Sequence, residues 1–81
     1  TPDEAVADGL GEIAHDARLD LWLAELPARS REVLERRFGL LEQPLQSLAE
    51  VAQVLGVSRE RVRQIEAEAL ARLRVRAREP N

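Results

Sequence analysis

The chain has 81 residues, of which 44% are hydrophobic and 33% charged, and it contains no Cys. This length allows one domain with a modest core and no catalytic cleft of its own, while the lack of Cys excludes disulfides and thiolate metal sites. No apolar run is long enough to cross a membrane and no signal peptide is present, so we expect a cytoplasmic protein that does not bind membranes.

Charge is divided unevenly along the chain. Residues 1–28 carry seven acidic side chains and one Arg, a net charge of −6, whereas residues 29–81 carry eleven Arg and eight acidic side chains, a net charge of +3. Such asymmetry predicts two surfaces with different partners. All twelve basic residues are Arg, which favours bidentate contacts, although a general bias of the composition explains the same count.

We expect residues 1–11 to form a linker that leads into a first helix. From Asp8 to Asp20, acidic residues four apart form a stripe, and their repulsion weakens this first helix unless an apolar face holds it. The stripe is Asp8, Glu12, Asp16 and Asp20, and the predicted apolar face is Ile13, Ala14, Ala17, Leu21 and Ala24, broadened by Leu19, Trp22, Leu23 and Leu26. The stripe contacts a basic partner, keeps the helix away from nucleic acid, or is simply solvated. Trp22 suits the core or an interface better than base stacking.

A second helix is predicted from about Ala28 to Phe38, because Pro27 fits the first turn of a helix but not its interior and Gly39 suits a helix end. Its inward side chains are Val33, Leu34 and Phe38, and its outward ones are Arg29, Arg31, Glu32, Arg36 and Arg37. Residues 40–46 then form an unusually apolar loop that contains Leu40, Leu41, Pro44 and Leu45.

Residues 47–55 predict a short helix opened by a capping box, in which Ser47 accepts from the Glu50 amide and Glu50 reaches back to Ser47. Gly56 can take the positive φ that ends this helix, and Ser58 can cap the next one. Each helix has a buried stripe: Leu48, Val51, Ala52 and Leu55 in the first, and Val62, Ile65, Ala69 and Leu73 in the second. This order is typical of a helix-turn-helix.

The outward face of the last helix carries Glu60, Arg63, Gln64 and Ala67, flanked by Arg59 and Arg61. Arg bonds two acceptors on a guanine edge, Gln pairs with an adenine edge, and Glu accepts from a cytosine amino group. This face therefore has the side chains with which proteins read the major groove. The alternative is a solvated helix whose Arg and Glu side chains merely pair with one another.

Four segments carry a family resemblance: Val57-Ser58-Arg59-Glu60-Arg61-Val62-Arg63-Gln64-Ile65-Glu66-Ala67, Leu26-Pro27, Arg31-Glu32-Val33-Leu34 and Arg37-Phe38-Gly39-Leu40. On these segments the chain resembles region four of the bacterial sigma-seventy family of transcription initiation factors, from about Leu19 to Arg74. Trp22-Leu23, Glu25-Leu26 and the run from Arg36 to Leu41 are similar to the stationary-phase, general-stress branch. Glu42-Gln43-Pro44 departs from that branch.

The resemblance implies an all-α bundle of about four helices that ends in the helix-turn-helix, of the winged-helix-like type without the wing. It implies binding to the minus-thirty-five element of double-stranded promoter DNA and docking on the flap of the RNA polymerase β subunit. Arg59, Glu60 and Gln64 would read bases, and Arg29, Arg37, Ser58, Arg61 and Arg63 would contact the backbone or flanking positions. The flap would meet Leu21, Leu40 and Leu41, and an activator would meet Arg72, Arg74 and Arg76.

We expect this domain to span residues 12–78, divided into a first helical pair with its loop (12–46) and the helix-turn-helix (47–78), with a tail at 79–81. Because the first residue is Thr, we expect a fragment of a longer protein. Two alternatives stay open. One is another helix-turn-helix regulator, such as a response-regulator output domain, and the other is a protein-interaction bundle held by an anti-sigma factor or an activator.

An enzyme is not expected. His15 is the only imidazole, and it lies among acidic residues without a nucleophile beside it. Nucleophilic catalysis needs a nucleophile, a base and an orienting group that converge in a cleft. We therefore expect no catalytic residues, no metal site and no cofactor.

Overall fold

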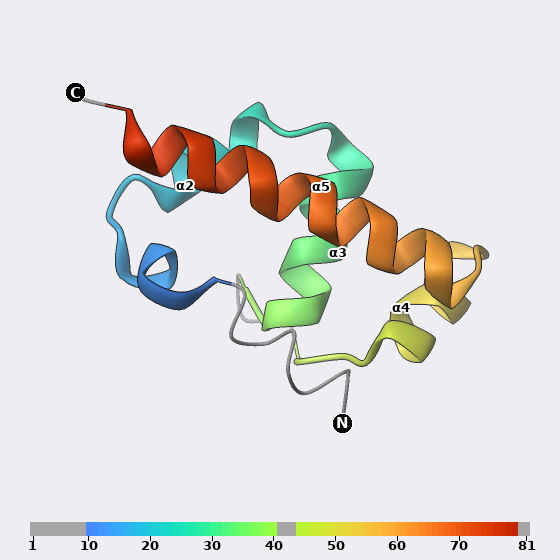
Figure 1. Cartoon of the computed structure of the whole chain (residues 1–81). Coiled ribbons are helices and arrows are strands. Elements are labelled where there is room, and N and C mark those ends of the chain that lie inside the picture. The colour runs from blue at the N-terminus through green and yellow to red at the C-terminus, as the bar shows by residue number, and fades with distance from the viewer. Residues whose placement is uncertain (1–9, 41–43, 80–81) are drawn as a thin grey trace.

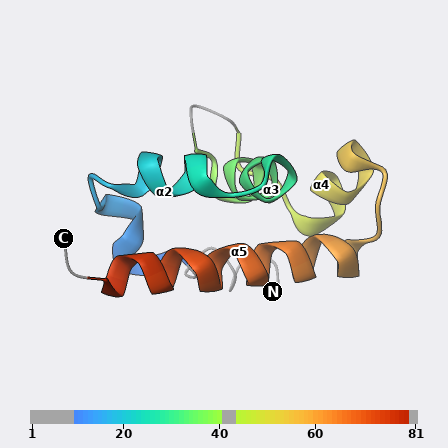
Figure 2. The ribbon, with the colours of Figure 1, turned by 90° about the horizontal axis from the view of Figure 1, so that it is seen from above.

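The computed structural model describes residues 10–40 and 44–79, which form four α-helices and one 3-10 helix and contain no strand. The 3-10 helix is η2 (Gly11–His15), and the α-helices are α2 (Leu19–Glu25), α3 (Ala28–Phe38), α4 (Leu48–Leu55) and α5 (Arg59–Arg78). Helix α5 crosses the length of the molecule (Figure 1), and seen from above it forms one layer while α2, α3 and α4 follow one another in a second layer (Figure 2). The predicted all-α fold is confirmed.

Two apolar clusters hold these layers together. The first joins η2, α2 and α3 to the C-terminal half of α5 and contains Leu10, Leu19, Trp22, Leu23, Leu26, Leu34, Ala69, Leu70 and Leu73. The second joins α3 and α4 to the N-terminal half of α5 and contains Val33, Leu48, Val51, Ala52, Val62 and Ile65. Helices α3 and α5 thus belong to both clusters, and α4 packs beside the half of α5 that was predicted to face DNA.

The predicted boundaries of α3 and α4 and the predicted start of α5 are confirmed together with the reasons for them. Helix α3 ends at Gly39 (φ 64°) and α4 ends at Gly56 (φ 70°), both in the left-handed region that suits Gly. The capping box at the start of α4 is complete, since the Ser47 hydroxyl accepts from the Glu50 amide and the Glu50 carboxylate accepts from the Ser47 amide. Ser58 caps α5 by accepting from the Arg61 amide at 3.0 Å.

The predicted first helix is wrong in its continuity. The 3-10 helix ends at His15, and Asp16 takes an extended conformation (ψ 129°). The Asp16 carboxylate accepts from the Arg18 amide at 2.8 Å and from the Arg18 guanidinium at 2.9 and 3.0 Å. Such local side-chain hydrogen bonds offer the backbone an alternative to a helix, so the acidic stripe is broken at this turn.

This break also changes which apolar residues are buried. Ala14, Ala17 and Ala24 are exposed and Leu21 keeps 70% of its surface, whereas the core takes the residues that were predicted only to broaden the face: Leu19, Trp22, Leu23 and Leu26. Trp22 is a core residue, as predicted. Leu10 is also buried in the core, so the predicted linker overlaps the packed domain by at least one residue.

Candidate nucleic-acid interface

The N-terminal half of α5 presents one continuous polar face to solvent. Arg59, Glu60, Arg61, Arg63, Gln64 and Ala67 are all exposed, while Val62 and Ile65 on the opposite side are buried against α4 and α3. The glycine turn and the Ser58 cap fix where this helix begins, so the face is held by packing on one side and by capping at its end. An exposed face on the second helix of a helix-turn-helix has the placement that a major-groove reader needs.

On this face the side chains interact with one another. The Arg63 guanidinium pairs with the Glu60 carboxylate, with Nε 2.5 Å from Oε1, and Arg61 donates to Gln64 Oε1 at 3.4 Å. Both partners of the Arg63–Glu60 pair are more than half exposed, so the pair contributes about 0–1 kcal/mol and separates at little cost. The pairing predicted as the alternative to DNA reading therefore exists in the unbound chain without competing strongly with a partner.

Two arginines occupy the first turn of α5, where the helix dipole is positive. Arg59 and Arg61 are the first and third residues of the helix, with Glu60 between them as the acidic residue of that turn. Cations at this end of a helix are unfavourable by a few tenths of a kcal/mol or more. The helix dipole therefore does not account for these two arginines, which suit a contact with an anion or a base edge.

A hollow of about 260 Å³ opens beside this face, between the start of α3 and the middle of α5. It is lined by Pro27, Arg29, Ser30, Arg61, Ile65, Glu68, Ala69 and Arg72. Three arginines thus surround one acidic residue, and within the described part of the chain Arg29 and Arg72 form no ion pair. The excess of positive charge makes this hollow suitable for a phosphate group.

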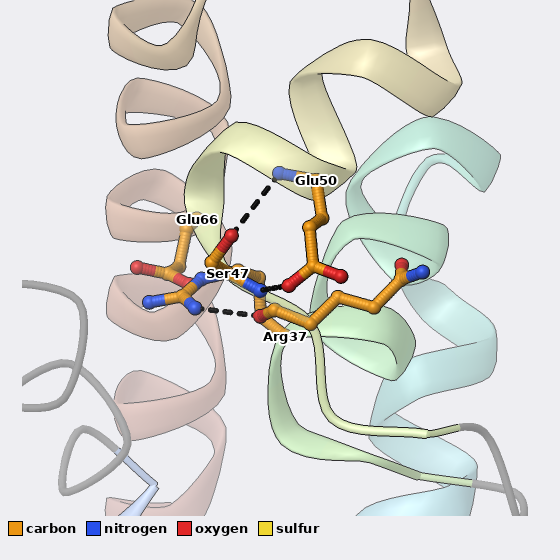
Figure 3. Close-up of polar contacts among 5 residues, drawn as sticks. Arg37, Ser47, Glu50 and Glu66 are labelled. Carbon is orange, nitrogen blue, oxygen red and sulfur yellow. Dashed lines mark hydrogen bonds and ion pairs between the residues drawn. The ribbon is translucent and has the colours of Figure 1, made fainter.

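Arg37 does not lie on the surface, and the prediction that it points outward is wrong. Its side chain is 4% exposed, its Nε lies 2.7 Å from Glu66 Oε1, and its Nη1 donates to the Gln46 carbonyl at 2.8 Å (Figure 3). Glu66 is 2% exposed. A DNA phosphate reaches Arg37 only if this buried pair opens, which would break its charge-assisted hydrogen bond with Glu66, so the structure does not present Arg37 to the DNA backbone.

Glu66 and Gln46 are the site residues that the sequence reasoning missed. A signal for Glu66 was present, because it lies four residues after Val62 and three before Ala69, on the buried stripe of α5. Arg37 likewise lies four residues after Val33 on the buried stripe of α3. Opposite charges on the apolar stripes of two different helices indicate a buried ion pair, since an unpaired buried charge is very costly. Gln46 had no such signal, because it contributes its backbone carbonyl.

The residues predicted to meet protein partners are dispersed. Leu21 is exposed on α2, Leu40 is half-buried against the first cluster, and Leu41 lies outside the described residues. Arg72 and Arg74 are exposed on α5. Arg76 pairs with Glu25 of α2 at 2.8 Å and with Glu79. These pairs raise the pKa of Arg76, chiefly through the hydrogen bond with Glu25.

An apolar groove of about 310 Å³ lies between α2 and the C-terminal part of α5. It is lined by Trp22, Glu25, Leu26, Arg72, Leu73, Val75 and Arg76. Arg72 therefore borders both this groove and the basic hollow, and Leu21 and Leu40 line neither.

Comparison with known proteins decides the family. The profile of the family described as Sigma-70, region 4, matches residues 22–75, which is more than half of the chain. The chain belongs to the sigma-70 region 4 family. This matched segment contains α3, α4 and nearly all of α5. Region 4 is the sigma-factor domain that recognises the minus-thirty-five promoter element, and the family is not enzymatic.

Curated relatives support the same family. The chain is 47% identical over 68 residues to RNA polymerase sigma factor SigA4 of Synechococcus elongatus, which covers 84% of the chain and 22% of the relative. It is 54% identical over 52 residues to RNA polymerase sigma-C factor of Nostoc sp., a match that covers 64% of the chain and 12% of the relative. It is 48% identical over 56 residues to RNA polymerase sigma factor RpoS of Coxiella burnetii, a match that covers 69% of the chain and 16% of the relative. The region 4 chain thus spans about a fifth or less of these relatives. No helix in the described ranges is long and apolar enough to cross a membrane.

Proposed function

We propose that this region 4 domain binds the minus-thirty-five element in the major groove through α5, as the promoter-recognition part of a sigma factor in transcription initiation. One observation carries the proposal: Arg59, Glu60 and Gln64 lie together on the exposed face of the second helix of a helix-turn-helix. Their guanidinium, carboxylate and amide groups match guanine, cytosine and adenine edges in the major groove. The proposal assigns the reading of bases to these three side chains.

The remaining polar residues around α5 are assigned to the DNA backbone. Arg61 and Arg63 flank the base-reading residues, and the Ser58 hydroxyl lies at the exposed N-cap. Arg29 borders the basic hollow across from Arg61. Contacts of this kind orient a protein on the duplex without reading its sequence, and they make the affinity depend on salt.

The assembly around the domain is proposed from its family. We propose that the RNA polymerase core docks on the surface that includes Leu21, Leu40 and Leu41, and that an activator or anti-sigma factor meets Arg72, Arg74 and Arg76. On this proposal the protein acts in the cytoplasm. The stationary-phase branch is the proposed subtype, supported by the Trp22-Leu23 and Arg36-to-Leu41 segments and by the likeness to the RpoS relative.

Binding to DNA tests the proposal directly. We would measure the fluorescence anisotropy of a labelled duplex with the minus-thirty-five hexamer and of a scrambled duplex, at low and moderate salt. We expect Arg59→Ala and Glu60→Ala each to reduce the preference for the hexamer by roughly 1–3 kcal/mol, the value of one base contact. Arg78→Ala and Glu68→Ala are the matched controls, since they remove an Arg or a Glu from α5 outside the base-reading face and should change affinity for both duplexes equally.

The opposite outcome is also clear. Weak binding of equal strength to both duplexes, with a strong dependence on salt, would reject direct reading by this domain. If the domain binds neither duplex at any salt concentration, the result favours the protein-interaction bundle. Binding of a protein partner at an apolar interface should then respond little to salt.

A further inference from the structure

A buried polar cluster joins three helices at the back of the helix-turn-helix. Arg37 comes from the last turn of α3 and Glu66 from the middle of α5 (Figure 3). The Gln46 carbonyl belongs to the segment that enters α4. Arg37 and Glu66 are 4% and 2% exposed. They are 29 residues apart in the chain, so only tertiary packing brings them together. The sigma-factor assignment gives this pair no role in reading DNA.

The cluster holds the start of α4 from two sides. The Gln46 amide donates to the Arg36 carbonyl at 2.9 Å, and its side-chain oxygen accepts from Arg36 Nη1 at 3.4 Å. The Gln46 carbonyl accepts from Arg37. The next residue, Ser47, is the cap of α4, so the position of this helix is connected through Gln46 to α3 and, through Arg37, to Glu66 of α5.

The same cluster contacts α5 on its buried side. Glu66 is two residues beyond Gln64 on the same rigid helix, but on its buried side. Apolar contacts on that side are not directional, whereas a charge-assisted guanidinium hydrogen bond has a fixed geometry. A shift of one residue in the buried contacts turns an α-helix by about 100°, which would turn Arg59, Glu60 and Gln64 away from the groove.

Stability alone does not account for such a pair. Buried ion pairs are often replaced by apolar residues without loss of stability, because desolvation of the two charges offsets their attraction. Their best-attested use is to specify one arrangement among several. The arrangement in question here is that of α4 against α5.

We propose that Arg37 and Glu66 are positioning residues for promoter recognition, which set the rotation of α5 relative to α4 and do not touch DNA. Arg37 is thereby distinguished from Arg29, which is exposed and assigned to a phosphate. The inference rests on the proposed function for its measurement with DNA. A second measurement without DNA distinguishes failure of the positioning role from failure of the proposed function.

The DNA experiment compares Arg37→Lys, Glu66→Gln, the double variant Arg37→Met with Glu66→Leu, and Arg29→Gln as the control. Lys keeps the charge but lacks the fork that joins Glu66 and Gln46. We expect each of the first three to lower the preference for the hexamer roughly tenfold, the scale of coupling between residues in contact, with an unchanged slope of log affinity against log salt. Arg29→Gln should lower that slope by about one and keep the preference.

Urea unfolding verifies that each variant is folded when it is assayed. The double variant is the decisive one, since apolar replacement of both charges should keep the unfolding midpoint near that of the parent while the preference for the hexamer falls. Full preference in a folded double variant would overturn the inference. A lower slope of log affinity against log salt in the double variant, together with a parent-like slope and preference in Glu66→Gln, would overturn it as well and return Arg37 to the phosphate contacts.

Nuclear magnetic resonance supplies the readout without DNA. In Arg37→Lys we expect the backbone amide chemical shifts to change at residues 46–50 and at the base-reading face of α5, and to stay the same in α2. Changes confined to the neighbours of Arg37 within α3 would overturn the inference whether or not the parent prefers the hexamer. A parent chain without preference would reject the proposed function and leave this second readout to decide the positioning role.

Discussion

At the scale of single residues, arginine serves three different purposes in this domain. Arg37 is buried and paired with Glu66, Arg18 closes a turn with Asp16 and lies 4.8 Å from the Trp22 ring, and Arg59 is exposed on α5. The guanidinium is the same in each case, and its surroundings decide whether it orders the core, orders a turn or lies at the surface, where we propose that it contacts DNA.

Asp16 allows a prediction about pH. Its pKa is lowered from 3.8 to about 2, first by the hydrogen bond from the Arg18 side chain and then by the one from the Arg18 amide. A carboxylate with a lowered pKa in the folded state stabilises it above the pKa of the unfolded chain and loses this effect as pH falls. We expect Asp16→Asn to lower the melting temperature at pH 7, with the difference from the parent shrinking between about pH 4 and pH 2.

The control for this prediction is the same substitution in an Arg18→Gln background. Because Arg18 is the cause of the lowered pKa, the pH-dependent difference should disappear there. A difference that persists without Arg18 would show that Asp16 acts through another group.

At the scale of elements, α3 and α5 connect the two halves of the core. Neighbouring residues of α3 belong to different clusters, Leu34 to the one with α2 and Val33 to the one with α4. Helix α5 spans both. The pairing of these helices therefore sets the geometry of the surface that we propose faces DNA, and α2 contributes to the other end of the core.

This arrangement predicts a large cost for truncation in α3. Leu34 is fully buried, so Leu34→Ala removes apolar contacts and leaves a cavity, with an expected loss of about 2–5 kcal/mol in the free energy of unfolding. Leu21→Ala is the matched control, because Leu21 is 70% exposed and a surface change costs about 0.5 kcal/mol or less. Urea unfolding measures both, and similar losses in the two variants would contradict the placement of the core.

At the scale of the whole molecule, charge is the feature that opposes DNA binding. The chain has a net charge of −3, with the acidic excess in residues 1–28 and the basic excess in residues 29–81. The proposed DNA-binding face therefore belongs to the basic part of a chain that is acidic overall. Long-range repulsion of this kind is weakened by salt within a Debye length of about 10 Å at 0.1 M.

Neutralising the first acidic residues tests this effect. The triple variant Asp3→Asn, Glu4→Gln and Asp8→Asn brings the formal net charge to zero. We expect affinity for the hexamer and the scrambled duplex to rise equally at low salt, on the order of two- to fivefold, and the gain to vanish at high salt. An altered preference between the two duplexes would instead assign these acids a direct part in recognition.

The sequence by itself determined the parts of this protein that depend on neighbours within a few residues. The Ser47 capping box, the glycine ends at Gly39 and Gly56, and the 3.6-residue periodicity of α3, α4 and α5 are local, so the helix-turn-helix and its exposed Arg59, Glu60 and Gln64 could be placed in advance. Their roles toward DNA stay predictions.

Only the tertiary structure decided where the remaining charged residues lie. Arg37 follows Val33 by four residues on the buried stripe of α3, but its partner Glu66 is 29 positions away, so only the packing of α3 against α5 brings the two charges together. In the sequence, Asp16 fits an acidic stripe along one helix. In the structure it bonds to Arg18 between two separate helical segments, and Trp22 of the second segment packs in the core with residues of α5. Burial and pairing are properties of the packed chain, because the same charged side chain stabilises or destabilises the folded state according to the groups that surround it.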